Sequence, residues 1–247
     1  MKQEQGTEFS MEQMEAIYPP GTERHYWSRA RNRIILDTLK GLVGSHMKML
    51  EIGCGRGVVL EAVRAEGYEC CGVDATFLPD STCREYISYG KNFTELDPSF
   101  LASIEVVLLF DVIEHIKDDQ TFLDSIRAHF PNLKYCVVTV PACMSLWSNF
   151  DVFNGHFRRY SLVTLRELVQ RSRFSIAFDS YFFHMLYVPA RLYSLLNVTR
   201  ETVMKVPAKG LMSHLHSLVA LFLFGEYKIL PRHLRGSSII MVLEVIN

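Results

Sequence analysis

The sequence predicts an α/β fold, doubly wound, in which helices cover both faces of a mostly parallel sheet. Residues 49–63 form a pattern of short apolar strand, glycine turn and helix. Residues 70–74 are typical of a second buried strand, which ends in a carboxylate. Residues 104–110 are an apolar run with a single charged residue, as expected for a strand that is covered on both faces. These three patterns together indicate alternating strands and helices.

The turn after the first strand indicates a ligand site. Gly53, Gly55 and Gly57 occupy alternate positions, where glycine permits positive φ and a close approach of ligand to backbone. The helix that starts near Gly57 directs free N–H groups and its positive dipole end toward this turn. A dinucleotide-binding turn places its last glycine three residues beyond the second, whereas here only one residue separates them. The pattern therefore predicts a nucleotide-like ligand that has no pyrophosphate.

Acidic residues follow two further strands. Asp74 stands 17 residues beyond Gly57, about where a ribose-binding acid is expected, and it can accept hydrogen bonds from both ribose hydroxyls. Asp111 follows the strand at 104–110. Ligands of open parallel sheets bind outside the carboxyl ends of the strands. We therefore expect Gly53, Asp74 and Asp111 to share one crevice.

In residues 51–57, 72–74 and 110–116 the chain resembles the class I S-adenosylmethionine-dependent methyltransferases, in particular bacterial small-molecule enzymes of sugar, cell-surface, secondary-metabolite and quinone pathways. The resemblance implies a Rossmann-like sheet of seven strands whose last strand is inserted antiparallel. It implies S-adenosyl-L-methionine as the cofactor, with the segment at 110–116 passing under its methionine part. The cofactor-binding residues implied are Glu51, Gly53, Cys54, Gly55, Gly57, Asp74, Ala75, Asp111 and Val112.

We expect one domain over residues 1–247, with helical additions at two places. Residues 1–22 are polar and are expected to pack loosely. An aromatic and arginine-rich helix follows, and the resemblance makes residues 1–45 a lid that helps to close the cofactor pocket. Residues 184–236 are aromatic-rich and mostly helical, and are expected to form a cap inserted before the last strand.

The remaining elements complete an alternating α/β order. Residues 174–183 and 238–246 are expected to be the last two strands of the sheet. Other elements expected are a helix over 81–88, a third strand near 86–89, a helix over 121–130, a fifth strand over 134–140 and a helix that begins at a Ser161 cap. The residue that holds the adenine amino group is left open between Asn92, Asp97 and a backbone carbonyl.

A base near the crevice would assist transfer to an oxygen or nitrogen acceptor, because such an acceptor must lose a proton. The first candidate for this catalytic role is His156, which lies in the long connection 142–160. The second is His115. An alternative interpretation is that His156 only packs the connection. The cofactor itself carries the reactive methyl group, so the chain needs no nucleophile.

Four residues are candidates for binding the acceptor: Arg159, Tyr160, Tyr26 and Arg29. Paired arginines beside a histidine suit an acidic acceptor such as a carboxylate or a phosphate-bearing sugar. His214 and His216 stand two positions apart and cannot share a helical face, so no metal site is expected.

Composition limits the partners. The net charge of −1 and the pI of about 6.8 give no basic surplus for a nucleic-acid partner. Six cysteines show neither a CxxC pair nor zinc spacing, which predicts reduced thiols and a cytoplasmic location. No secretion signal or transmembrane segment is expected. The expected partner is a small-molecule acceptor, while peripheral membrane contact or a homodimer would each account for the apolar cap.

Two other functions share part of this pattern. An NAD-dependent oxidoreductase has a similar strand, turn and ribose acid, but predicts the wider glycine spacing. A non-catalytic cofactor-binding protein would keep the sheet and lack transfer. The methyltransferase interpretation requires S-adenosylmethionine or its demethylated product to bind while NAD does not.

Overall fold

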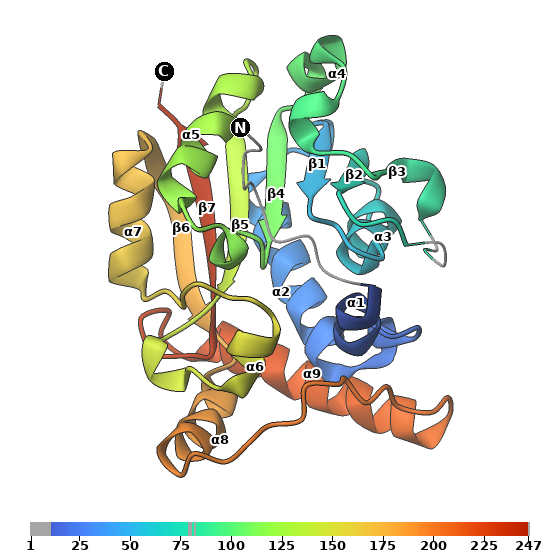
Figure 1. Cartoon of the computed structure of the whole chain (residues 1–247), viewed down its shortest axis with the longest axis vertical. Helices are drawn as coiled ribbons and strands as arrows, with labels where there is room; N and C mark the ends of the chain where they lie inside the picture. Colours follow the sequence, from blue (N-terminus) through green and yellow to red (C-terminus); the bar gives the residue numbers. More distant parts are fainter. Residues whose placement is uncertain (1–10, 79–80, 82, 247) are drawn as a thin grey trace.

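The structure is a computed structural model that describes residues 11–78, 81 and 83–246. Its centre is a seven-stranded sheet, shown in Figure 1. In spatial order the strands are β3 (Ile87–Tyr89), β2 (Cys70–Asp74), β1 (Met49–Ile52), β4 (Val106–Phe110), β5 (Tyr135–Pro141), β7 (Ser238–Val245) and β6 (Phe174–Phe182). β7 pairs antiparallel with β5 and β6, whereas the other pairs are parallel. The predicted fold class, including the antiparallel last strand, is confirmed.

Helices cover both faces of the sheet because alternate side chains of each buried strand point to opposite faces. Val107 and Leu109 of β4 belong to one core, together with α4 (Pro98–Ser103), α5 (Asp119–His129) and α7 (Leu162–Arg171). Val106 and Leu108 belong to the other core, together with α2 (Tyr26–Leu42), α3 (Val58–Ala65) and α9 (Leu211–Ile229). β4 is buried throughout, as its apolar run predicts.

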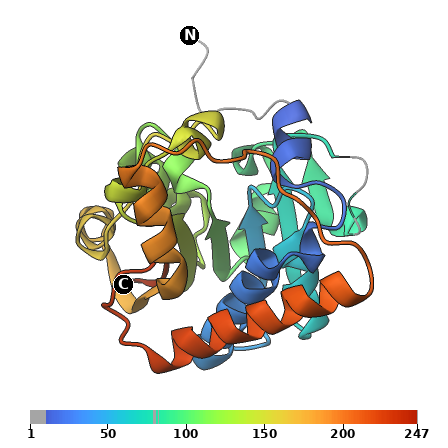
Figure 2. The same cartoon turned by 90° about the horizontal axis from the view of Figure 1, so that it is seen from below.

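The helices of the two ends of the chain meet at the carboxyl ends of the parallel strands. α1 (Met11–Ile17) and the start of α2 lie there, beside α8 (His184–Leu195) and α9. Viewed from below, α9 runs alongside α2, and the connection between α8 and α9 crosses this end of the molecule (Figure 2). α6 (Asn149–Phe153) lies in the connection between β5 and α7. The division into lid, domain and cap stays a prediction.

Two expectations about local structure are wrong. The helix expected over 81–88 is replaced by the short 3-10 turn η2 (Arg84–Tyr86), which leads directly into β3; residue 82 lies outside the described part. The residues of this turn have no buried side chain, so no apolar face stabilises a longer helix there. The third strand itself is confirmed.

The second error concerns the loose packing expected for residues 1–22. Residues 1–10 lie outside the described part, but α1 is helical and is attached to the rest of the chain. The Gln13 side chain donates to the carbonyl of Phe153 (3.0 Å), and Arg56 Nε donates to the carbonyl of Tyr18 (2.6 Å). These contacts bridge segments that are distant in sequence, so a local polarity pattern does not predict them. None of the described helices combines the length and the apolar composition that a membrane span needs.

Candidate functional site

A cavity of about 1120 Å³ opens at the carboxyl ends of β1, β2 and β4. Gly53, Asp74 and Asp111, the residues at these three strand ends, all line it. They lie together because β1 pairs with both β2 and β4 in a parallel register, which aligns the three carboxyl ends. The predicted convergence of these three residues on one crevice is therefore what the structure shows.

The backbone after β1 requires glycine. Gly53 has φ of +73°, in the left-handed region that other residues rarely adopt. A Cβ at this position would also lie 2.9 Å from Cγ2 of Val112, which is too close for two carbon atoms. Gly57 has φ of +77° and caps the N-terminus of α3. The turn thus brings bare backbone to the cavity wall and starts a helix beneath it.

Asp74 is held by this turn. Its Oδ2 accepts a hydrogen bond from the backbone N–H of Gly55 (2.7 Å), and its Oδ1 accepts one from Thr76 N–H (2.8 Å). Burial raises the pKa of Asp74, and these two hydrogen bonds oppose that rise. Each carboxylate oxygen retains a further lone pair, so the carboxylate can still accept bonds from a ligand in the cavity.

A buried ion pair joins α2 to the end of β4. Arg31 Nη2 lies 2.7 Å from Oδ2 of Asp111, and Thr139 donates to Oδ1 of the same carboxylate (3.2 Å). The guanidinium also lies over the rings of Trp27 and Phe110, 4.9 and 5.7 Å from their centroids. Asp111 has φ of +56°, a strained conformation for a residue with a side chain. The ion pair holds Asp111 in this conformation at the cavity wall.

Two further carboxyl groups lie deeper in the cavity wall. Glu51 and Glu114 are both buried, and neither Oε2 of Glu51 nor either carboxyl oxygen of Glu114 has a hydrogen-bond partner within the described residues. Burial raises the pKa of Glu51 to about 8, although Arg31 opposes the rise. Burial, with the neighbouring Asp111, raises the pKa of Glu114 well above its usual range. The cavity therefore contains buried acceptor groups that a cationic ligand would satisfy.

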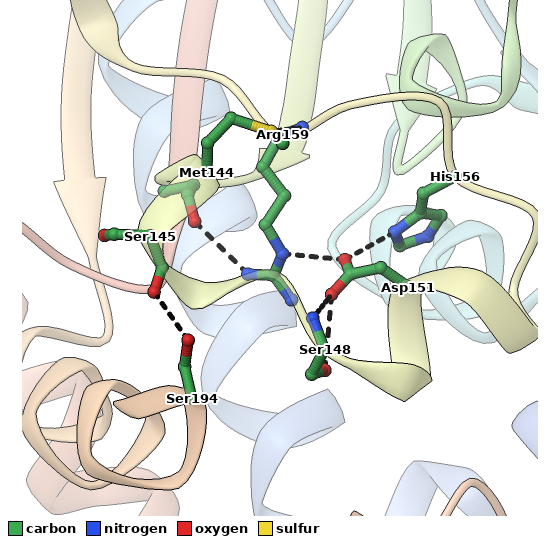
Figure 3. Close-up of polar contacts among 8 residues, drawn as sticks. Met144, Ser145, Ser148, Asp151, His156, Arg159 and Ser194 are labelled. Atoms are coloured by element: carbon green, nitrogen blue, oxygen red, sulfur yellow. Dashed lines mark hydrogen bonds and ion pairs between the residues drawn. The ribbon is translucent and has the colours of Figure 1, made fainter. Parts of the chain in front are cut away.

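The connection after β5 contributes a histidine with a buried partner (Figure 3). Asp151 of α6 is fully buried, and its Oδ1 accepts from His156 Nδ1 (2.9 Å) and from Arg159 Nε (2.7 Å). Its Oδ2 accepts from the backbone N–H of Ser148 (2.9 Å). Burial alone would raise the pKa of Asp151. The hydrogen bonds and charges of His156 and Arg159 outweigh this effect and lower the pKa of Asp151 below its ordinary value. An ionised Asp151 places the ring proton of neutral His156 on Nδ1 and leaves Nε2 as a lone-pair acceptor.

His115 lies beside His156, with ring centroids 4.6 Å apart. Burial and the neighbouring His156 lower the pKa of His115 to about 3, so this ring is neutral. Glu114, His115 and His156 offer ligand atoms within 4.8 Å of one another, a grouping that could hold a metal ion. The sequence-based expectation of no metal site thus stays a prediction.

The structure brings most of the sequence-predicted residues to the cavity. The lining residues among them are Glu51, Gly53, Cys54, Gly55, Asp74, Ala75, Asp111, Val112, His115, His156, Arg159 and Tyr26. Three lie elsewhere. Gly57 is the N-cap of α3 and does not line the cavity. Tyr160 is buried, with its hydroxyl donating to Asp119 Oδ2 (2.7 Å), and Arg29 donates to the carbonyl and hydroxyl oxygens of Ser213 on α9.

Several cavity residues were not predicted. Tyr18, Asp151 and Asn154 line the cavity or support its wall, and the segment 198–205 covers one side. No local pattern identifies Asp151, because its contact with His156 depends on how α6 orients its side chain. Of the two side chains that were candidates for the adenine group, Asn92 lines the cavity, whereas Asp97 caps the N-terminus of α4.

Comparison with known proteins identifies the family. A family model described as a methyltransferase domain matches residues 23–177. The ubiquinone biosynthesis O-methyltransferase of Rickettsia conorii is 29% identical over 105 residues, which are 39% of this chain and 36% of that protein. The chain thus matches about a third of the length of this curated relative.

Solved methyltransferase structures share the fold at low identity. The phosphoethanolamine N-methyltransferase 2 of Haemonchus contortus, in complex with S-adenosyl-L-methionine, has a TM-score of 0.57 at 14% identity, covering 98% of this chain and 61% of that one. The plantazolicin methyltransferase BamL has a TM-score of 0.53 at 9% identity, covering 94% and 88%. Because the family model matches more than half of the chain, the chain belongs to the methyltransferase-domain family, and it is a class I S-adenosylmethionine-dependent methyltransferase.

Proposed function

We propose that the enzyme transfers a methyl group to an oxygen or nitrogen atom of a small-molecule acceptor, and that His156 removes the acceptor's proton. The observation that carries the proposal is the hydrogen bond of 2.9 Å between His156 and the buried Asp151, placed in the same cavity as the strand-end carboxylates. A base oriented in this way assists transfer when the acceptor is a hydroxyl or an ammonium group.

The cavity residues fit the cofactor. S-adenosylmethionine supplies a methyl group on a positively charged sulfur, so no residue of the chain has to act as a nucleophile. The unpartnered oxygens of Glu51 and Glu114 would accept from or face its cationic groups. Asp74, which is fixed by the backbone of Gly55, would hold the ribose hydroxyls. The bare backbone at Gly53 would allow the adenosyl group to approach the sheet.

His156 would act through Nε2. In the neutral ring Nδ1 donates to Asp151, which leaves a lone pair on Nε2 toward the acceptor proton. As the proton moves to Nε2, the ring becomes cationic, and the carboxylate of Asp151 stabilises that charge. Arg159 lies 2.7 Å from the same carboxylate and helps to keep it ionised. The chain's other contribution is to exclude water and to align the acceptor atom.

The acceptor side of the cavity favours a molecule with an apolar or aromatic body. The apolar and aromatic residues on this side are Trp27, Phe150, Leu186, Pro189, Ala190, Tyr193 and Val198, and the charged Arg200, Glu201 and Lys205 line the cavity as well. The guanidinium of Arg159 already donates to Asp151 and to the carbonyl of Ala142 (3.2 Å), so it is less suited to an acidic acceptor than its sequence position suggests. The apolar walls favour a quinone-like phenol over a sugar as the acceptor. An O-methyltransferase of ubiquinone biosynthesis is among the relatives.

The test is His156→Asn against a panel of phenols, hydroquinones, amines and sugars, with formation of S-adenosylhomocysteine as the readout. We expect kcat to fall by about 10²- to 10⁴-fold, with the affinity for S-adenosylhomocysteine unchanged in calorimetry. Asp151→Asn is expected to lower kcat as well, because the ring then loses its orientation. His46→Asn, an exposed histidine, is the matched control. Full transfer by the folded His156→Asn enzyme would remove the proposed base.

A further inference from the structure

An apolar surface outside the cavity extends along α9. From Leu211 to Gly225 the helix contains no Asp, Glu, Lys or Arg. Its exposed apolar side chains are Leu211, Met212, Leu215, Leu218, Val219, Leu221, Phe222 and Ile229, with Leu218 65% and Phe222 59% exposed. Isolated exposed apolar residues are common, but so many on one helix indicate a surface that meets an apolar partner.

The opposite side of α9 is already packed. Ala220, Leu223 and Tyr227 are buried in the core that contains α2, and the Tyr227 hydroxyl lies 3.3 Å from that of Thr38. Within the described part of the chain, the outward side chains are therefore left to the solvent while the helix lies flat along the molecule (Figure 2).

α8 continues this surface. The backbone N–H of Met185 at its start donates to Glu226 of α9 (2.8 Å), which joins the two helices. α8 exposes Met185, Val188, Leu192 and Leu195. We call the exposed apolar residues of α8 and α9 the α8–α9 surface. Leu186, Pro189 and Ala190 on other positions of α8 line the cavity, so the surface adjoins the acceptor side of the site.

Charge is distributed unevenly between this region and the rest of the chain. Residues 184–236 contain seven Lys and Arg residues and two Glu residues, a net charge of +5. The remaining residues contain 19 basic and 25 acidic side chains, a net charge of −6, although the whole chain is close to neutral. Exposed cations stand at both ends of α9, with Lys209 before it and Arg232 and Arg235 after it.

We propose that the α8–α9 surface docks on the surface of an anionic lipid bilayer. The apolar side chains would enter the interface between headgroups and acyl chains, while the cations at the ends of α9 would contact lipid phosphates. A symmetric dimer through the same surface would bring the exposed cations at the ends of α9 of two copies close together, so repulsion opposes it. This inference goes beyond the proposed function and does not depend on the identity of the acceptor.

The experiment is vesicle co-sedimentation of the full chain. We expect the wild type to sediment with phosphatidylcholine vesicles that contain about 30 mol% phosphatidylglycerol, and less with pure phosphatidylcholine. Leu218→Glu should lower the partition coefficient by about tenfold or more, because it places a charge in the interface. Val163→Glu on α7, at a residue 61% exposed, is the matched control and should bind as the wild type does.

A second variant tests the electrostatic part. Arg232→Glu combined with Arg235→Glu should weaken binding to the anionic vesicles and reduce its dependence on salt. Circular dichroism and binding of S-adenosylhomocysteine verify the fold of each variant. Wild type that stays in the supernatant with anionic vesicles overturns the proposal. The proposal is also overturned if the wild type does not bind vesicles but forms a dimer in light scattering, and Leu218→Glu dissociates that dimer. The α8–α9 surface would then join two copies of the chain.

Discussion

The buried carboxyl of Glu51 predicts a pH-dependent gain in stability for the Glu51→Gln variant. The pKa of Glu51 in the fold is about 8, against 4.5 for the free side chain, because burial disfavours its charged form. Its contribution to stability is therefore fully present below pH 4.5 and is lost as the pH rises through 8. Glutamine keeps the shape of the side chain and cannot ionise, so the variant avoids this loss.

The magnitude follows from the shift. At pH 5 the ionisation of Glu51 in the unfolded chain already costs the wild type somewhat less than about 1 kcal/mol, apart from the pH-independent effect of the amide. The difference should then grow by about 1.4 kcal/mol per pH unit and reach about 4–5 kcal/mol above pH 8. His115, whose pKa is lowered to about 3, contributes in the opposite direction, since its stability is present above pH 6.5 and lost as the pH falls. That contribution is common to both proteins and cancels in the difference.

The assay is urea unfolding of the cofactor-free proteins, followed by circular dichroism from pH 5 to pH 9. Glu244→Gln on β7 is the matched control, because its carboxyl is exposed to water and should give no comparable gain. The affinity of Glu51→Gln for S-adenosylhomocysteine should fall in the same samples if the carboxyl accepts from the cofactor. A difference in unfolding free energy that stays constant from pH 5 to pH 9 would refute the burial argument.

Two further substitutions test the cofactor side of the cavity by calorimetry with S-adenosylhomocysteine. Gly53→Ala should weaken binding by about tenfold, because the added Cβ displaces Val112. Gly67→Ala is the control: Gly67 also has a positive φ, +89°, but no atom lies within 4 Å of its added Cβ, so this variant should lose stability alone. Equal affinities of these two variants would contradict the steric argument. Asp74→Asn should weaken binding by roughly tenfold or more, whereas Asp97→Asn should not, and an unchanged Asp74→Asn would separate that residue from the ribose.

The sequence predicted the elements whose signals are local. β1, β2 and β4 are short buried strands, so continuous apolar runs identify them, and the glycines after β1 have the positive φ that only a tight turn requires. The antiparallel β7 followed from the family resemblance. The same resemblance predicted S-adenosyl-L-methionine as the cofactor. The family match excludes the two alternatives, an NAD-dependent oxidoreductase and a non-catalytic cofactor-binding protein.

Features that depend on tertiary contacts were missed. Arg29 and Arg31 stand two positions apart on α2, and composition does not show that Arg31 faces Asp111 while Arg29 faces α9. The pairing of Asp151 with His156 depends on the turn of α6. In the same way α1 is held by bonds to distant segments, which no local pattern contains.

The position of β7 has a consequence for synthesis of the chain. β6 is translated before β7, yet β7 lies between β6 and β5 and hydrogen-bonds to both. While the ribosome is still making residues 183–237, β7 is absent, so β6 and the edge of β5 are both unpaired. Unpaired strand edges can pair with those of other nascent chains and so promote aggregation. Closure of the sheet therefore waits for the last strand, and a chain that stops before Ser238 leaves both edges open.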